Sequence, residues 1–152
     1  MKHFVVRHAE AGERRRWKGP DELRPLSPKG RRQAKVLAEQ LAEKGVARIW
    51  SSPTLRCCQT VEPLAERLHL PVEVAPELAE GTGAAGVLKL ARNAEVTSVM
   101  CTHGDVLDAL LDHLAQEGLD LGKKPRCAKG STWVLDVREG RVVEAAYLPA
   151  PR

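Results

Sequence analysis

The 152-residue sequence is poor in aromatic residues, which make up only 3% of the chain. Leu, Val and Ala must therefore fill most of the core, as in helices packed on a small sheet. No apolar run approaches the ~18 residues of a membrane span, and the apolar run near Met1 is too short for a signal peptide. We therefore expect a cytoplasmic protein that does not interact with membranes.

Cysteine is also scarce, and the spacing of Cys57, Cys58, Cys101 and Cys127 fits neither a zinc site nor a secreted disulfide scaffold. We expect reduced, buried thiols. With 43% hydrophobic and 29% charged residues, and without internal repeats or linkers, the composition predicts one globular domain over residues 1–152. The formal net charge of +4 favours anionic ligands.

Short apolar runs alternate with segments of helical periodicity along the whole chain. Strands are predicted over 4–6, 46–50, 72–74, 96–101, 132–137 and 142–147. Helices are predicted from Ser27-Pro28 to Gly45, from Ser52-Pro53 to Leu68, over 84–92 and from Gly104 to Leu114. Ser27 and Ser52 are the expected N-caps of the first two helices, each followed by a proline. This order predicts an α/β three-layer sandwich, a mostly parallel central sheet flanked by helices, with ligands beyond the carboxyl ends of the strands.

Two strand ends and one helix start carry the residues best suited to chemistry. Arg7 and His8 follow the first strand, His103 follows the fourth, and Arg56 lies near a helix start. Their convergence on one crevice would create a phosphate site, because an arginine fork binds two phosphate oxygens and helix N-termini attract anions.

Each of these residues has a physical task in phosphoryl transfer. His8 can attack phosphorus only when its imidazole is neutral, and we expect nearby guanidinium groups to lower its pKa. Arg7 and Arg56 would clamp the phosphate, and His103 would donate a hydrogen bond to the transferring group. Gly104 would leave room for the oxyanion.

Residues 14–18 form a basic stretch without apolar periodicity, beside Gly19-Pro20. Two interpretations stay open, a solvated loop and a loop that draws phosphate towards the site. On the second interpretation, Lys18 and Arg24 are candidate substrate-binding residues. Neither an aromatic stacking platform nor a basic recognition helix accompanies the stretch, so the sequence does not favour nucleic acid as a partner.

Three motifs, in order along the chain, resemble those of the histidine phosphatase superfamily, also called phosphoglycerate mutase-like. They are Val6-Arg7-His8-Ala9-Glu10, Ser51-Ser52-Pro53-Thr54-Leu55-Arg56-Cys57-Cys58-Gln59-Thr60 and Thr102-His103-Gly104. Leu26-Ser27-Pro28-Lys29-Gly30 with Gln33-Ala34 is similar to the family's helix entry.

The resemblance implies that His8 is the phosphorylated nucleophile and that Arg7, Arg56 and His103 complete the pocket, without a metal or organic cofactor. Ala9 replaces the family's usual glycine, and its methyl group could crowd the phosphate. Leu78-Ala79-Glu80-Gly81 resembles the family's Leu-x-Glu segment. Glu80 is therefore the candidate general acid, with Glu77 and Glu10 as further candidates.

The chain resembles small SixA-type members that act on phosphohistidine, and this is the predicted activity. Several segments also resemble the phosphatase half of actinobacterial MutT-type Nudix fusion proteins, which implies a nucleoside diphosphate or small phosphoester as the alternative substrate. These segments are Arg16-Trp17-Lys18-Gly19, Arg24-Pro25-Leu26, Arg56 to Thr60 with Glu62 to Ala65, and Lys129 to Leu135. The expected partner is a phosphorylated protein, or a small phosphorylated metabolite or nucleotide.

Two other readings remain open. A phosphate-binding adaptor without turnover could carry the same pocket. A metallophosphoesterase could use Asp105 and Asp108, because Gly104 to Asp108 spells Gly-Asp-x-x-Asp. Against the metal reading, Asp108 falls on a predicted apolar helix and the companion metal motifs are missing.

Overall fold

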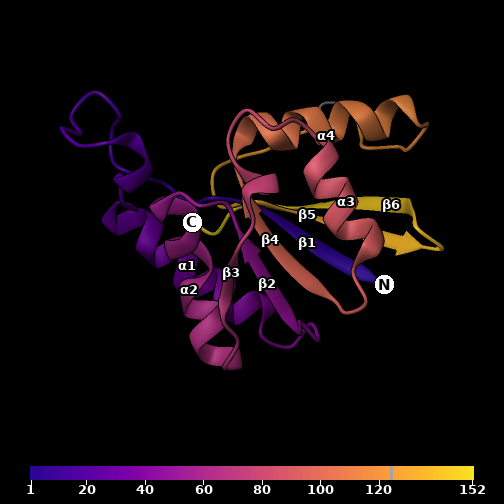
Figure 1. Ribbon diagram of the computed structural model, residues 1–152, viewed down its shortest axis with the longest axis horizontal. Helices are drawn as coiled ribbons and strands as arrows, with labels where there is room; N and C mark the ends of the chain where they lie inside the picture. The colour runs from indigo at the N-terminus through magenta and orange to yellow at the C-terminus, as the bar shows by residue number, and fades with distance from the viewer. Residues whose placement is uncertain (124) are drawn as a thin grey trace.

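The structure, a computed structural model, describes residues 1–123 and 125–152. One six-stranded sheet has the order β3-β2-β4-β1-β5-β6 (Figure 1). The strands are β1 (Lys2–Arg7), β2 (Arg48–Ser51), β3 (Val72–Val74), β4 (Ser98–Thr102), β5 (Thr132–Arg138) and β6 (Arg141–Leu148). The first four are parallel, and β5 and β6 join antiparallel beside β1. This confirms the predicted α/β fold with a mostly parallel sheet.

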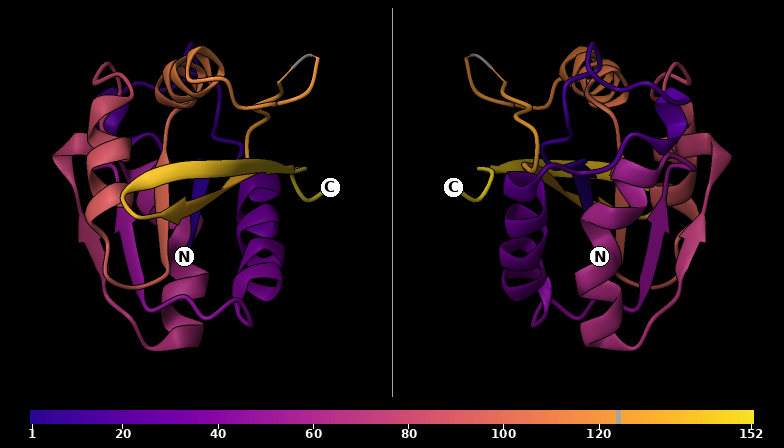
Figure 2. Two further views of the ribbon diagram at one scale, coloured as in Figure 1. Left: turned by 90° about the vertical axis from the view of Figure 1, so that its right-hand side faces the viewer. Right: turned by 90° about the vertical axis from the view of Figure 1, so that its left-hand side faces the viewer.

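Helices cover both faces of the sheet, giving the predicted three layers (Figure 2). One face packs against α1 (Pro28–Leu41) and α2 (Leu55–Leu68), and the other against α3 (Ala85–Asn93) and α4 (Gly104–Gln116). Two short 3-10 helices, η1 (Asp21–Leu23) and η2 (Pro76–Leu78), lie in connections.

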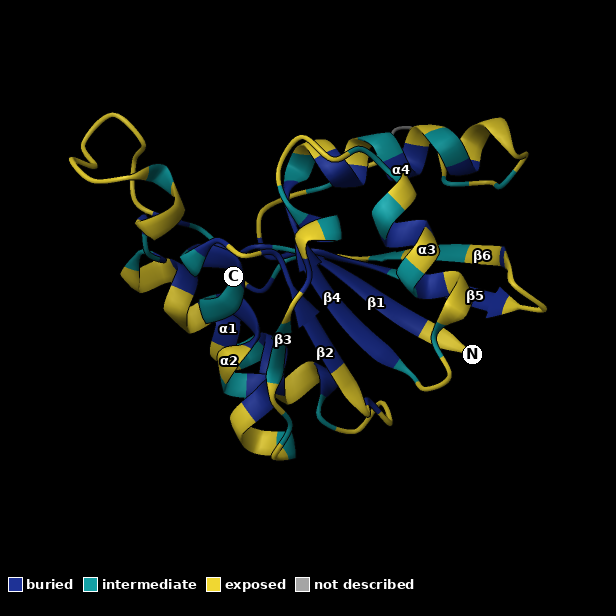
Figure 3. Ribbon diagram, viewed as in Figure 1, coloured by how far each residue is buried: buried dark blue, intermediate teal, exposed yellow. Residues whose placement is uncertain are grey.

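Side chains of β1 alternate between the two halves of the core, as the period of a strand requires. Val5 packs in the cluster with α3 and α4, whereas Phe4 and Val6 pack in the cluster with α1 and α2. Figure 3 shows β1 and β4 buried along almost their whole length. A strand that is buried on both faces has a continuous run of apolar residues in its sequence, which explains why β1 and β4 could be predicted as strands.

Two helix starts show how far local capping rules hold. Ser27 caps α1 as predicted, because its side chain accepts a hydrogen bond from the Gly30 amide. The second helix begins at Leu55 rather than at Pro53, and its N-cap Thr54 makes no side-chain cap bond. The Ser52 hydroxyl is used elsewhere, in the site described below.

The carboxyl ends of three parallel strands meet at one edge of the sheet. The His8 amide donates to the Thr102 carbonyl over 3.0 Å, and the Ser52 amide donates to the Cys101 carbonyl over 2.9 Å. These bonds continue the ladder one residue beyond β1 and β2. Residues from three distant parts of the sequence are therefore held side by side.

The connection between β1 and α1 projects from the body of the protein (Figure 1). Its two ends are anchored, since Ala11 and Leu26 form an antiparallel bridge. The side chains of Gln59 and Thr60, in α2, hold the two ends of this connection in place. The Gln59 side chain accepts a hydrogen bond from the Leu26 amide, and Thr60 Oγ1 accepts one from the Ala9 amide, each over 2.9 Å.

Gly30 is where α1 approaches the segment after His8 most closely, and this predicts a strong effect of a methyl group. A Cβ at residue 30 would lie 1.9 Å from the Glu10 carbonyl oxygen. We expect Gly30→Ala to lower the free energy of unfolding by about 1–3 kcal/mol, despite the better helix propensity of Ala. Urea unfolding measures this change. Gly12→Ala is the control, because a Cβ there meets nothing within 4 Å; equal losses in both variants would contradict the packing described.

Candidate active site

A cleft of about 560 Å³ opens at the edge where β1 and β4 end. Besides Glu10, one of the further candidates for the general acid, it gathers seven of the residues that the sequence analysis named for catalysis or substrate binding. They are Arg7, His8, Arg24, Arg56, Glu80, His103 and Gly104. The convergence expected from strand ends and helix starts is therefore present in the structure.

His8 lies at the base of the cleft with only 7% of its surface exposed. Its Nδ1 is 2.8 Å from the carbonyl oxygen of Ala9. Because a carbonyl oxygen can only accept, Nδ1 carries the proton and Nε2 keeps a lone pair. The neutral ring is thus in the tautomer that a nucleophilic Nε2 requires.

The environment of His8 lowers its pKa to about 4. Burial is the largest cause, because it disfavours the charged ring. The Arg56 charge and the neighbouring His103 act in the same direction, while Cys57 and the Ala9 carbonyl oppose them. The expectation that a guanidinium group lowers this pKa holds for Arg56, but burial, which the sequence analysis did not consider, lowers it more.

His103 faces His8 across the cleft, with ring centroids 5.5 Å apart. Its Nε2 lies 2.8 Å from Ser52 Oγ, and its buried Nδ1 has no partner among the described residues. When the Ser52 hydroxyl donates to Nε2, the proton of the neutral ring lies on Nδ1. That arrangement makes Nδ1 a free hydrogen-bond donor, and Ser52 the residue that selects the tautomer.

Arg7 lies against the first turn of α4, where Gly104 gives it room. Its Nη1 donates to the Cys127 carbonyl over 2.5 Å. A Cβ at residue 104 would come within 2.8 Å of the guanidinium carbon of Arg7. The glycine therefore makes space for a guanidinium group, which is a different use from the oxyanion space expected from the sequence.

Arg56 is 1% exposed, and it supplies a further unpartnered donor. The Nε atoms of Arg7 and Arg56 and the Nδ1 atom of His103 are all buried without a partner in the described part of the chain. A buried donor left unpaired costs about 1–3 kcal/mol. An anion with several acceptor oxygens in the cleft could satisfy all three.

Three carboxylates were candidates for a general acid, and the structure separates them. Glu80 lines the cleft, 48% exposed, with its oxygens 3.6 Å from Arg56 Nη2 and from Arg14 Nη2. Glu10 also lines the cleft, but its carboxylate is 3.3 Å from Ser27 Oγ and 3.5 Å from Lys29 Nζ. Glu77 lines a separate hollow beside Trp50.

The family model of the histidine phosphatase superfamily (branch 1) matches residues 3–86, more than half of the chain. The chain belongs to the histidine phosphatase superfamily. A curated relative, the 8-oxo-(d)GTP phosphatase of Mycolicibacterium smegmatis, is 38% identical over 97% of this chain and 48% of its own length. The chain thus spans about half the length of that relative.

Solved structures of similar proteins have the same fold. The protein histidine phosphatase SixA in complex with tungstate is 25% identical, with a TM-score of 0.76 over 97% of this chain and 94% of that one. The mycobacterial glucosyl-3-phosphoglycerate phosphatase in complex with VO3 is 18% identical, with a TM-score of 0.71 over 96% of both chains. At that identity the second likeness concerns the fold alone.

Ala9 is a departure from the histidine phosphatase pattern that does not reach the cleft. Its side chain packs with Leu26 and Ala34 in a small buried cluster, and it is absent from the cleft lining. The methyl group therefore does not crowd the space beside His8.

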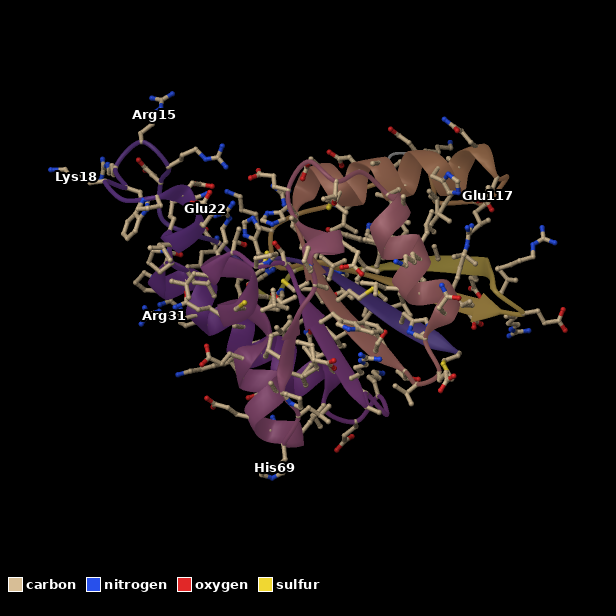
Figure 4. The ribbon with its side chains drawn as sticks, viewed as in Figure 1. Arg15, Lys18, Glu22, Arg31, His69 and Glu117 are labelled. Atoms are coloured by element: carbon tan, nitrogen blue, oxygen red, sulfur yellow. The ribbon has the colours of Figure 1, made fainter. Side chains whose placement is uncertain are left out.

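The basic stretch after Gly12 divides between the cleft and the solvent. Arg14 lines the cleft, whereas Lys18 does not. Figure 4 shows Lys18 and Arg15 at the outer end of the projecting loop, away from the body of the protein. The structure thus does not bring Lys18 to the site as expected. Arg24 does line the cleft, but its Nη1 bonds the Gly12 carbonyl and its Nε bonds Asp21.

Sequence reasoning missed Asp21 at the site, named Asp105 only as a possible metal ligand, and gave no individual role to Arg14 or Lys129. Asp21 bonds Arg56, and Lys129, Asp105 and Arg14 line the cleft. The Asp105 carboxylate accepts a 2.7 Å hydrogen bond from the Gly81 amide, which fixes the segment that carries Glu80. These residues lie in loops or on a helix turn, where no periodic pattern marks them. Two sequence signals were available, the basic stretch that contains Arg14 and the family-like segment that starts at Lys129.

Other sequence expectations concern metals, thiols and membranes. Over residues 1–123 and 125–152, no group of three or more His, Cys, Asp or Glu is placed to hold a metal ion. All four cysteines are free; Cys57 and Cys101 are buried, and Cys58 and Cys127 are partly buried. Within the same described ranges, no helix has the length and apolarity that crossing a membrane requires.

The buried ring of His8 predicts an unusual titration. We expect a pKa near 4, with the proton of the neutral ring on Nδ1, so that His8 loses its nucleophilic lone pair only as the pH falls through about 4. Nitrogen NMR of the histidine rings measures both quantities, and His8→Asn identifies the signal. A pKa at the ordinary value of 6.5, or a proton on Nε2, would contradict the geometry of this site.

Proposed function

We propose that this chain is a phosphatase that transfers a phosphoryl group to Nε2 of His8 and then to water. One observation carries the proposal: a neutral, buried imidazole faces a cleft that holds three buried, unpartnered donor atoms. Phosphoryl transfer needs a positioned nucleophile and fixed donors for the oxygens of the transferring group, and these residues supply both.

In the first step, the Nε2 lone pair forms a bond to phosphorus, and the bond from phosphorus to the leaving atom breaks with its electron pair. Arg7, Arg56 and His103 donate to the phosphoryl oxygens. In the second step, water attacks phosphorus and the N–P pair returns to Nε2, while the water proton passes to solvent or to a carboxylate of the cleft. The Nδ1 proton stays on the ring, where the Ala9 carbonyl stabilises the charge of the phosphorylated imidazole.

Glu80 is the carboxylate best placed to protonate a leaving group, and its surroundings limit how well it can do so. Its oxygens lie 3.6 Å from the guanidinium groups of Arg56 and Arg14, so both are already engaged by cations of the cleft. A carboxylate engaged in this way is not free to turn towards the leaving atom of a substrate. Substrates whose leaving group needs no proton, such as a phosphoramidate or a phosphoanhydride, suit this site best.

Two substrate classes meet this requirement. Nucleotides come first, because the relative called an 8-oxo-(d)GTP phosphatase is 38% identical over 97% of this chain. Among nucleotides we choose a nucleoside diphosphate, because several segments resemble the phosphatase half of Nudix fusion proteins. Phosphohistidine, the activity predicted from the sequence, is the second candidate. It is supported by the likeness to SixA, a protein histidine phosphatase.

Parallel turnover assays test the function and rank the substrates. We expect hydrolysis of para-nitrophenyl phosphate, a higher kcat/KM for a nucleoside diphosphate, and a lower value for a phosphohistidine peptide. His8→Ala removes the nucleophile, so it should abolish all three activities with the fold intact. His69→Asn is the control, because His69 is an exposed residue at the end of α2 with φ +54°, a conformation that Asn tolerates.

Each outcome has one meaning. Phosphate binding without turnover of any substrate would identify an adaptor and refute the phosphatase. Full activity in His8→Ala would refute the nucleophile, and a preference for the phosphohistidine peptide would reverse the order of the two substrate classes.

A further inference from the structure

The guanidinium group of Arg56 makes two hydrogen bonds to Asp21. Its Nη1 donates to the backbone carbonyl of Asp21 over 2.9 Å, and its Nη2 donates to Asp21 Oδ2 over 3.1 Å. Asp21 belongs to η1, in the projecting loop, so this contact joins that loop to a buried arginine of the cleft.

The Asp21 carboxylate is itself held in place by two further arginines. Its Oδ1 accepts a hydrogen bond from Arg24 Nε over 3.1 Å and lies 3.4 Å from Arg14 Nε. Desolvation alone would raise the pKa of Asp21, but the Arg24 hydrogen bond and the charges of Arg56 and Arg14 together lower it. The carboxylate is therefore an ionised and oriented group at neutral pH.

The two contacts use only one edge of the Arg56 guanidinium. Asp21 occupies the edge formed by Nη1 and Nη2, at the end of the side chain. Nε, which forms the other bidentate edge together with Nη2, has no partner among the described residues. A phosphate that binds at this second edge would meet a fork whose plane is already fixed.

The same carboxylate places a negative charge close to any anion that Arg56 binds. Glu80 adds a second one, 3.6 Å from Arg56 Nη2. Like charges repel, and the repulsion is stronger at a partly buried site than in bulk water. A bound phosphate dianion is therefore held less tightly than by an arginine without a counter-ion, which favours the release of product phosphate.

We propose that Asp21 is a positioning residue that orients the Arg56 guanidinium for phosphoryl transfer and, as its resident counter-ion, weakens the hold on phosphate. The proposal rests on the phosphatase function proposed above. The projecting loop thereby has a role that its basic residues alone did not indicate. The charges of Arg14 and Arg24 help to hold the carboxylate of Asp21 in place.

Asp21→Asn tests both halves of the proposal, because it keeps the shape and the backbone carbonyl but removes the charge. We expect the Kd of inorganic phosphate, measured by calorimetry, to fall about tenfold. We expect kcat for para-nitrophenyl phosphate to fall about tenfold as well, because the guanidinium plane is less well fixed. The KM should not rise. Asp21→Glu keeps the charge and should bring the phosphate Kd back towards the wild-type value.

Glu22→Gln is the matched control. It removes the same charge from the next residue of η1, and Glu22 is exposed and makes no ion pair in the described part of the chain. Figure 4 labels Glu22 on this loop. Its phosphate Kd and kcat should match those of the wild type.

Three results would overturn the proposal. If Asp21→Asn and Glu22→Gln had the same phosphate Kd and the same kcat, Asp21 would have no special role. Weaker phosphate binding in Asp21→Asn, with a higher KM, would mean that Asp21 only anchors the loop. An unchanged kcat together with a lower phosphate Kd in Asp21→Asn would mean that Asp21 does not position Arg56. Calorimetry does not need turnover. A wild-type protein that binds phosphate but turns over neither para-nitrophenyl phosphate nor a nucleoside diphosphate nor a phosphohistidine peptide would refute the phosphatase, while the binding comparison would still test the counter-ion.

Discussion

The parallel pairing of β1 with β4 is the constraint on which the site depends. Its register sets Arg7 opposite Thr102, and the His8 amide then bonds the Thr102 carbonyl. His8 and His103 thereby leave neighbouring strands at the same level, with ring centroids 5.5 Å apart. A slip of one residue would turn alternate side chains to the opposite face, so the buried pattern of both strands protects this register.

The site is organised before a ligand binds, and burial is the main cause. Desolvation keeps His8 neutral, while protein groups hold the nearby cations in position: the Cys127 carbonyl binds Arg7, and Asp21 binds Arg56. Donors fixed in advance need not reorganise as charge develops on a phosphoryl group, which is the main source of electrostatic catalysis. The cleft thus combines a neutral nucleophile with cations whose orientation is already set.

Much of the fold and the centre of the site could be predicted from the sequence, because periodic signals and motifs mark them. Buried runs ending in Arg7-His8 and in Thr102-His103 placed both histidines at strand ends. Non-periodic segments carried no such signal. Lys18 was therefore expected at the cleft and Asp21 was overlooked, since the path of the loop depends on tertiary contacts with α2. The tasks of Ser52 and Gly104 were also misjudged, because each depends on a partner that only the folded chain brings near.

The central claim is that the phosphoryl group passes through His8 on its way to water. An alkaline quench during turnover, followed by tandem mass spectrometry of the digested protein, tests it most directly. We expect a phosphorylated peptide with the modification on His8, formed during turnover and lost as the substrate is consumed. Turnover without a phosphorylated His8, or a phosphoryl group found on His103 instead, would contradict it.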